Sequence, residues 1–144
     1  MTDRILVPLD DADPAWTALE AALERFTTDE IIVLHVLDTT ASSHGVGGGA
    51  ADGWLEAKKA DAQALLDQAQ ALADPYDITL TTVIESGYPA NIIVNVAMER
   101  DVSHIVMGSH GRSGISRILV GSVAEAVIRK APMSVTVARK PNAD

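Results

Sequence analysis

Cysteine is absent from this sequence of 144 residues, so disulfides, thiol chemistry and cysteine-based zinc or iron–sulfur sites are excluded. Long apolar runs are also absent, because none approaches the roughly 20 residues that a membrane-spanning helix needs. Residues 1–4 carry no basic stretch and no small-residue cleavage site follows, so no secretory signal is readable. These absences predict a soluble, cytoplasmic protein that has no membrane partner.

Basic side chains are scarce, since 11 Lys and Arg stand against 20 Asp and Glu and the net charge is −9. Non-specific binding to nucleic acid rests on Lys and Arg neutralising phosphates, so nucleic acid is not an expected partner. The balance is uneven along the chain. Residues 1–99 carry four basic and seventeen acidic side chains, whereas residues 100–140 carry seven basic and two acidic. An anion is therefore expected to bind to the C-terminal third.

Short apolar or β-branched runs alternate with segments of helical periodicity. The runs predict buried strands over residues 5–10, 31–37, 78–84, 105–107 and 134–138. The periodic segments predict helices over residues 13–25, 52–73, the stretch after Pro89, and about 123–130. This alternation predicts a single domain, residues 1–144, with an α/β fold: a parallel sheet covered by helices on both faces. In such a sheet the ligand binds at the carboxyl ends of the strands, where the strand order reverses.

Proline, aspartate and glycine mark the expected ends of these elements. Asp13 is expected to cap the first helix, with Pro14 as its first residue, and Asp74 with Pro75 is expected to end the second helix. Residues 38–51 are glycine-rich and predict a loop. No Gly-Lys-Ser/Thr follows these glycines, so they do not form a phosphate-binding loop of that type.

A glycine constellation follows the fourth predicted strand. It runs from Gly108 to Gly114 and continues at Gly121-Ser122, with the spacing Gly-x2-Gly-x9-Gly-Ser. Glycines let backbone amides approach phosphate oxygens closely, and the start of a helix adds free N–H groups and the positive end of its dipole. Arg112 and Arg117 can add charge-assisted bonds.

The start of the last helix has a second interpretation. Ser122 and Glu125 match the capping-box pattern S-x-x-E, which needs no ligand. Both interpretations can hold at once, because a capped helix still offers other amides.

The remaining chemistry-bearing residues predict neither catalysis nor metal binding. His35 and His104 lie in or beside apolar runs and are expected to be strand residues with satisfied ring nitrogens. No histidine pair has metal-ligand spacing, and neither a Gly-x-Ser-x-Gly elbow nor a dinucleotide fingerprint is present. Pro8 forfeits a hydrogen bond within a predicted central strand. This break either releases backbone toward a ligand or marks the end of the strand.

These residues resemble the universal stress protein family over the whole chain. The resemblance is carried by Ile-Leu-Val-Pro-Leu-Asp at 5–10, Leu-His-Val at 34–36, Gly-Tyr-Pro-Ala at 87–90, and residues 105–112 followed by Gly121-Ser122. It implies a five-stranded parallel sheet in the order 3-2-1-4-5. In that order Asp10 and Gly108 face each other across the crevice between the first and fourth strands.

The resemblance also implies an adenine nucleotide, ATP or AMP or ADP, and a set of residues that hold it. The base and ribose would lie along Pro8, Leu9, Asp10, Val36, Met107 and Gly108. The phosphates would lie against His110, Gly111, Arg112, Gly121, Ser122 and Val123. An accompanying Mg²⁺ would be held mostly by the phosphates and water.

Two positions depart from the family pattern. Asp11 brings a second carboxylate near the expected anion, and Ala124 lacks a hydroxyl that nucleotide-binding members often have. The loss of one such hydrogen bond weakens binding by roughly 0.5 to 1.5 kcal/mol.

The sequence and the resemblance together predict a small stress-response sensor that binds a nucleotide with little or no turnover and is read by an unidentified protein. A homodimer through the edge of the fifth strand is expected. One alternative is a slow ATPase or phosphotransferase in which Asp10 or Asp11 positions water and Arg112 or Arg117 stabilises phosphate charge. The other is an interaction protein of the same fold that binds no nucleotide, suggested by Asp11 and Ala124.

Overall fold

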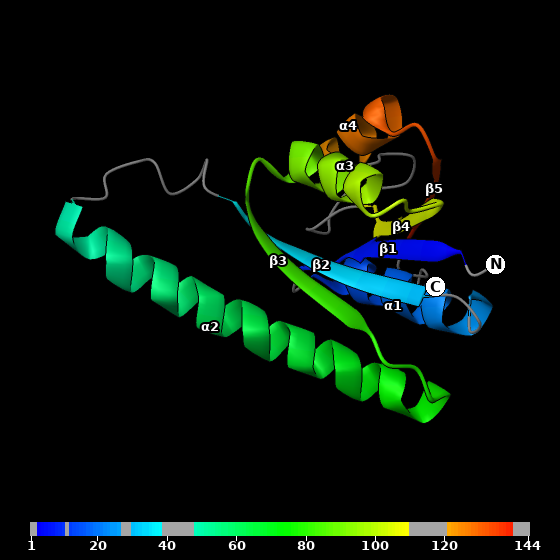
Figure 1. Ribbon diagram of the computed structural model, residues 1–144, viewed down its shortest axis with the longest axis horizontal. Coiled ribbons are helices and arrows are strands. Elements are labelled where there is room, and N and C mark those ends of the chain that lie inside the picture. The colour runs from blue at the N-terminus through cyan, green and yellow to red at the C-terminus, as the bar shows by residue number, and fades with distance from the viewer. Residues whose placement is uncertain (1–2, 11, 27–29, 39–47, 110–120, 140–144) are drawn as a thin grey trace, which may run out of the picture.

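The computed structural model describes residues 3–10, 12–26, 30–38, 48–109 and 121–139. Five strands form one parallel sheet in the order β3-β2-β1-β4-β5, with helices on both sides (Figure 1). The predicted fold class and strand order are confirmed. Among the described helices, none is long and apolar enough to cross a membrane.

The strands and helices alternate along the chain. The strands are β1 (Arg4–Pro8), β2 (Glu30–Asp38), β3 (Thr81–Gly87), β4 (His104–Gly108) and β5 (Ser134–Ala138). The helices are α1 (Asp13–Arg25), α2 (Gly48–Ala73), the short 3-10 turn η2 (Asp74–Tyr76), α3 (Pro89–Glu99) and α4 (Ser122–Lys130).

The central strands are apolar on both faces because each face is covered by a pair of helices. Ile5 and Val7 of β1 pack in one core with α1 and α2, whereas Leu6 packs in the other core with α3 and α4. Successive side chains of a strand point to opposite faces, so an unbroken apolar run is what a doubly covered strand requires.

The third strand begins three residues later than predicted. The side chain of Gln70 in α2 accepts from the Leu80 amide at 2.9 Å and donates to the Ile78 carbonyl at 2.9 Å. These backbone groups are therefore bonded to α2, and regular pairing with β2 starts at Thr81 opposite Ile32.

Two predicted helix starts are also wrong. Ala12, not Asp13, is the N-cap of α1, so Asp13 lies in the first turn and Pro14 directly follows it. Helix α2 begins at Gly48, inside the segment predicted to be a loop. Glycine disfavours a helix by only about 1 kcal/mol per residue, which the rest of a long helix can offset. Residues 39–47 lie outside the described part of the chain.

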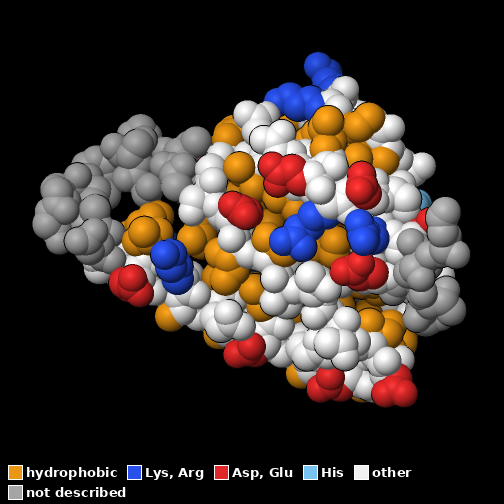
Figure 2. Space-filling model, in the orientation of Figure 1, with side chains coloured by type: hydrophobic (Ala, Val, Ile, Leu, Met, Phe, Trp, Pro, Cys, Tyr) orange, Lys and Arg blue, Asp and Glu red, His pale blue; other side chains and the backbone are white. Residues whose placement is uncertain are grey.

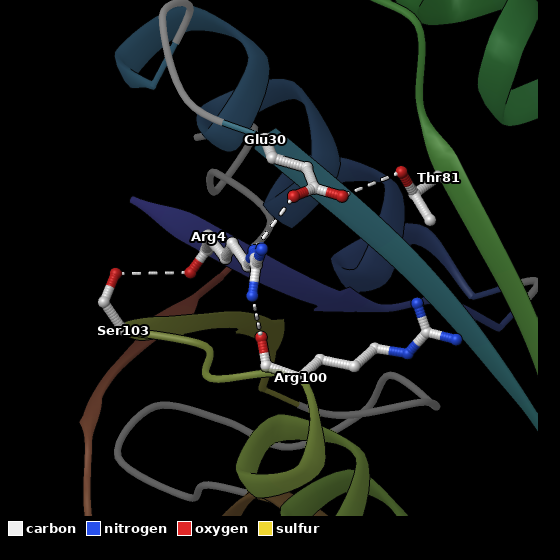
Figure 3. Close-up of polar contacts among 5 residues, drawn as sticks. All are labelled: Arg4, Glu30, Thr81, Arg100 and Ser103. Atoms are coloured by element: carbon white, nitrogen blue, oxygen red, sulfur yellow. Dashed lines mark hydrogen bonds and ion pairs between the residues drawn. The ribbon is translucent and has the colours of Figure 1, made fainter. Parts of the chain in front are cut away.

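The amino ends of the strands are tied together by side chains (Figure 3). The Arg4 guanidinium contacts the Glu30 carboxylate at 3.1 Å and donates to the Arg100 carbonyl at 2.9 Å. The other oxygen of Glu30 accepts from the Thr81 hydroxyl at 3.1 Å, and the Ser103 hydroxyl donates to the Arg4 carbonyl at 3.2 Å. This network, which we call the amino-edge network, joins the starts of β1, β2 and β3 to the turn before β4.

Candidate functional site

A cavity of about 390 Å³ lies at the opposite, carboxyl edge of the sheet. Its walls come from the ends of β1, β2 and β4 and from the first residues of α1, α3 and α4. The lining residues are Pro8, Leu9, Asp10, Pro14, Ala15, Leu34, His35, Val36, Asp38, Pro89, Ile93, Met107, Gly108, Ser109, Gly121, Ser122, Val123 and Ala124.

The cavity lies where β1 and β4 part. The two strands pair at Ile5↔His104 and Leu6↔Ile105, whereas β1 pairs with β2 as far as Pro8↔Leu34. The Leu9 amide donates to the Leu34 carbonyl of β2, and amides alternate sides along a strand, so position 8 faces β4. Proline has no amide hydrogen to offer there. Both interpretations of Pro8 agree with the structure, because β1 ends at this residue and its β4 side opens onto the cavity.

Gly108 allows α1 to begin directly against the end of β4. A Cβ atom at this position would lie 2.6 Å from the carbonyl carbon of Pro14 and 2.7 Å from the nitrogen of Ala15. These are backbone atoms, which cannot swing away as the end of a side chain can. The missing side chain at Gly108 is therefore needed for the helix to approach the strand, whatever the cavity binds.

The start of α4 is held by the chain that leaves β4. The Gly121 amide donates to the Ser109 carbonyl at 2.5 Å, and the Ser109 amide donates to the Ala138 carbonyl at the end of β5 at 2.9 Å. Gly121 is the N-cap, and no side chain caps the helix. The predicted capping box is wrong, because Ser122 is already the first helical residue and Glu125 pairs with Arg129 at 3.1 Å.

This arrangement leaves donors at the cavity wall. In a helix that begins at Ser122, the amides of the first turn have no partner within the helix. Ser122, Val123 and Ala124 all line the cavity. Ala124, the position where a hydroxyl is missing, therefore lies against any ligand bound there.

The structure brings together nine of the twelve residues predicted to hold a nucleotide. The nine that line the cavity are Pro8, Leu9, Asp10, Val36, Met107, Gly108, Gly121, Ser122 and Val123. His110, Gly111 and Arg112 lie outside the described part of the chain, as do Asp11 and Arg117.

Sequence reasoning missed most of the other half of the lining. Apart from Ala124, which the family pattern singled out, the residues not predicted as ligand contacts are Pro14, Ala15, Leu34, His35, Asp38, Pro89, Ile93 and Ser109. Most lie at the first turn of a helix or at the end of a strand, so the topology rule that places ligands at strand ends was the signal that could have found them.

The described walls contain helix starts but no Lys or Arg side chain. Their formally charged side chains are Asp10 and Asp38. One oxygen of Asp10 accepts the Ala12 amide at 2.9 Å. Helices α1, α3 and α4 all begin at the cavity, and the start of a helix carries partial positive charge and free amides.

Both histidines lie in strands, as predicted, and one ring nitrogen of each has a hydrogen-bond partner. The Nδ1 atom of His35 lies 2.8 Å from the Leu9 carbonyl oxygen, and Nε2 of His104 lies 2.6 Å from the Thr136 hydroxyl. Among the described residues, no group of three or more His, Asp or Glu side chains could hold a metal ion.

Figure 2 shows Lys and Arg side chains at the edge of the molecule above α4 and Asp and Glu side chains along the lower edge. Side chains of both signs are mixed over the middle of this face and near one end of α2. Of the helix starts that reach the cavity, the start of α4 belongs to the more basic part of the chain.

Strand order and cavity together define a class: a doubly wound α/β domain with a ligand crevice at the point where the strand order reverses. The sequence identifies the family to which the chain belongs within this class. It belongs to the universal stress protein family, whose sequence pattern matches residues 1–139.

Individual relatives agree with this assignment. Universal stress protein MJ0531 of Methanocaldococcus jannaschii is 34% identical over 143 residues, covering 96% of this chain and 82% of that protein. The solved structure of hypothetical protein MJ0577, from the same organism, has a TM-score of 0.84 at 30% identity and covers 99% of both chains. A universal stress protein family protein of Arabidopsis thaliana, solved with AMP bound, shares the fold with a TM-score of 0.72 at 18% identity, covering 99% of this chain and 94% of that one.

Proposed function

We propose that this chain, acting as a single domain, binds an adenine nucleotide in the cavity at the carboxyl edge and serves as a cytoplasmic sensor in the stress response. The observation that carries the proposal is the convergence of three helix starts on one cavity at the parting of β1 and β4. One of them is the start of α4, where the amides of residues 122–124 have no partner within the helix. Free amides and positive helix ends are what a phosphate group requires.

The size and lining of the cavity support the same ligand. Its volume of about 390 Å³ falls within the range of roughly 300 to 1,000 Å³ typical of small-molecule sites. Apolar side chains such as Ile93 and Met107 offer a surface for a base, and Asp10 can accept from ribose hydroxyls. A protein of the same fold has AMP bound.

Residue roles follow the predicted set. The base and ribose lie against residues 8–10, Val36, Met107 and Gly108, and the phosphates against Gly121, Ser122 and Val123, with residues 110–112 as further phosphate contacts. Mg²⁺ accompanies ATP and is held mainly by the phosphates and water.

The direct test is calorimetric titration with Mg-ATP, ADP and AMP, with GTP as the comparison, together with identification of any nucleotide that co-purifies. An adenine nucleotide should bind more tightly than GTP. If none of the four binds, the chain is an interaction protein of this fold instead.

Position 122 offers a matched pair of variants for the role of the backbone. Ser122→Ala removes only the hydroxyl, whereas Ser122→Pro also removes an amide hydrogen. Proline suits the first residue of a helix, and the Gly121 backbone (φ −58°, ψ 159°) suits a residue before proline. We expect Ser122→Pro to weaken nucleotide binding by about tenfold and Ser122→Ala by a smaller factor. Equal affinities in the two variants would contradict phosphate binding by this amide.

We propose binding with little or no turnover, because the Asp10 oxygen described above is already occupied by the Ala12 amide and is not free to position a water molecule. Phosphate release under multiple-turnover conditions tests this. Sustained release that disappears in Asp10→Asn would favour the ATPase or phosphotransferase alternative.

We further propose a homodimer through β5, which forms one end of the sheet and has only β4 as its partner within the described chain. Its residues Val135 to Ala138 are half-buried and apolar or β-branched, a combination that suits pairing with a second copy. Light scattering at high micromolar concentration should report a dimer. A monomer at that concentration would contradict the dimer through β5. It would give no information on the surface that a protein partner of the nucleotide-bound state contacts.

A further inference from the structure

His35 makes a contact that the nucleotide-binding role does not use. Its Nδ1 atom lies 2.8 Å from the carbonyl oxygen of Leu9, the residue that directly follows Pro8. A carbonyl oxygen only accepts hydrogen bonds, so Nδ1 carries the hydrogen and donates. The ring is half-buried and belongs to the cavity wall, as does Leu9.

Leu9 is held by β2 at both of its backbone groups. Its amide donates to the Leu34 carbonyl at 2.8 Å, and its carbonyl accepts from the next residue along β2, His35. Strand β1 ends at Pro8, and its pairing with β4 ends at Leu6. The His35 side chain therefore holds the Leu9 carbonyl just beyond the last residue of β1, where regular pairing with β2 has ended.

Asp10 directly follows Leu9, the residue that is fixed in this way. The Asp10 carboxylate accepts a hydrogen bond from the Ala12 amide at 2.9 Å. Ala12 is the N-cap of α1, so this bond lies where the chain enters the helix. Leu9, Asp10 and the start of α1 all line the cavity. Release of the Leu9 carbonyl would therefore loosen the attachment of Leu9 and Asp10 to β2.

We propose that His35 is a positioning residue: its Nδ1–H bond to the Leu9 carbonyl holds the Leu9–Asp10 turn in the geometry that the ligand meets, before the ligand arrives. The proposal deepens the proposed function, on which its affinity test rests. The same bond affects which polar group the ligand meets. Because the Leu9 carbonyl is bonded to His35, the polar group that this turn offers to the ligand is the Asp10 carboxylate.

The chain offers a nearly isosteric pair of variants at this position. His35→Asn keeps an N–H donor close to the place of Nδ1, whereas His35→Leu fills a similar space without a donor. We expect His35→Leu to weaken Mg-ATP or AMP binding by about tenfold and His35→Asn by less than about threefold. The matched control is His104→Leu, which removes a histidine of the same sheet that bonds to Thr136 and does not line the cavity. It should leave the affinity within about twofold. Equal losses in His35→Asn and His35→Leu would overturn the proposal.

A double-mutant cycle with Asp10→Ala asks whether His35 acts through the turn. If it does, His35→Leu should weaken binding much less in the Asp10→Ala background than in the parent protein. If the double variant loses affinity by the product of the two single-variant factors, the two residues act independently, which would contradict the proposal.

Measurements on the ligand-free protein separate this proposal from the proposed function. Nitrogen-15 spectra of the His35 ring should show the hydrogen on Nδ1, and amide exchange at Ala12 should accelerate in His35→Leu but not in His35→Asn. If these results hold while no nucleotide binds the parent protein, the positioning role stands and the nucleotide assignment fails. If a nucleotide binds but Ala12 exchange is the same in both variants, the nucleotide assignment stands and the positioning role fails.

Discussion

The two edges of the sheet close in opposite ways. At the amino edge, side chains satisfy one another: Arg4, Glu30 and Thr81 form one connected set, and the Ser103 hydroxyl returns to the backbone of Arg4. At the carboxyl edge, β1 and β4 part after Leu6, and the space between them becomes a cavity. One sheet thus has a closed end and an open end.

The difference follows from the direction of the helices. In a βαβ unit each helix begins at the carboxyl edge, so its free amides gather there, and it ends at the amino edge. Tyr76, just before β3, belongs to the closed end: partial burial and the carboxylates of Glu24 and Glu20 raise its pKa. The open end thus has helix starts at the wall of a cavity, whereas the closed end uses its polar groups within the protein.

The largest effect is expected from a substitution at the open, carboxyl edge of the sheet. Gly108→Ala would place a Cβ atom 2.6 to 2.8 Å from the backbone of Pro14 and Ala15, so α1 must shift away from β4. We expect the free energy of unfolding to fall by roughly 1 to 3 kcal/mol, a typical result of overpacking. Urea unfolding measures this change. Nucleotide affinity should fall as well, because the shifted backbone lines the cavity.

Gly53→Ala is the control for Gly108→Ala. Gly53 lies in α2, and a Cβ atom there would meet nothing within 4 Å. Alanine in a helix is more stable than glycine by about 0.5 to 1 kcal/mol, so this variant should be slightly more stable than the parent. A Gly108→Ala protein as stable as the parent would show that α1 and β4 are not locked together at this point.

The sequence predicted the fold well because every strand of the centre is covered on both faces. Short apolar runs such as 31–34, which are rich in β-branched residues, are typical of strands buried on both faces. The errors fall at ends of elements. The start of β3 depends on Gln70, a residue of another element that takes the Ile78 and Leu80 backbone, and no local pattern around residue 78 shows this.

The open edge could be predicted in part. The glycine spacing and the family resemblance located the ends of β1 and β4 and the start of α4. The pattern S-x-x-E misled at Ser122, because the same Glu125 pairs with Arg129 one turn later along α4. The partner of His35 depends on the register of β2 against β1, which tertiary packing sets and a single sequence does not reveal.

The smallest expected effect concerns the closed edge. Arg4→Met keeps most of the side-chain length and removes both the ion pair with Glu30 and the bond to the Arg100 carbonyl. Because the two paired side chains remain 47% and 39% exposed, we expect the free energy of unfolding to fall by only about 1 kcal/mol, with a smaller difference at high salt. Arg129→Met is the control, since its pair with Glu125 in α4 is more exposed, at 75% and 58%, and should contribute about 0.5 kcal/mol or less. Both variants should bind the nucleotide within about twofold of the parent, since neither residue lines the cavity. A loss of affinity in Arg4→Met alone would show that the two edges are coupled through the strands, and the division into a structural end and a binding end would have to be abandoned.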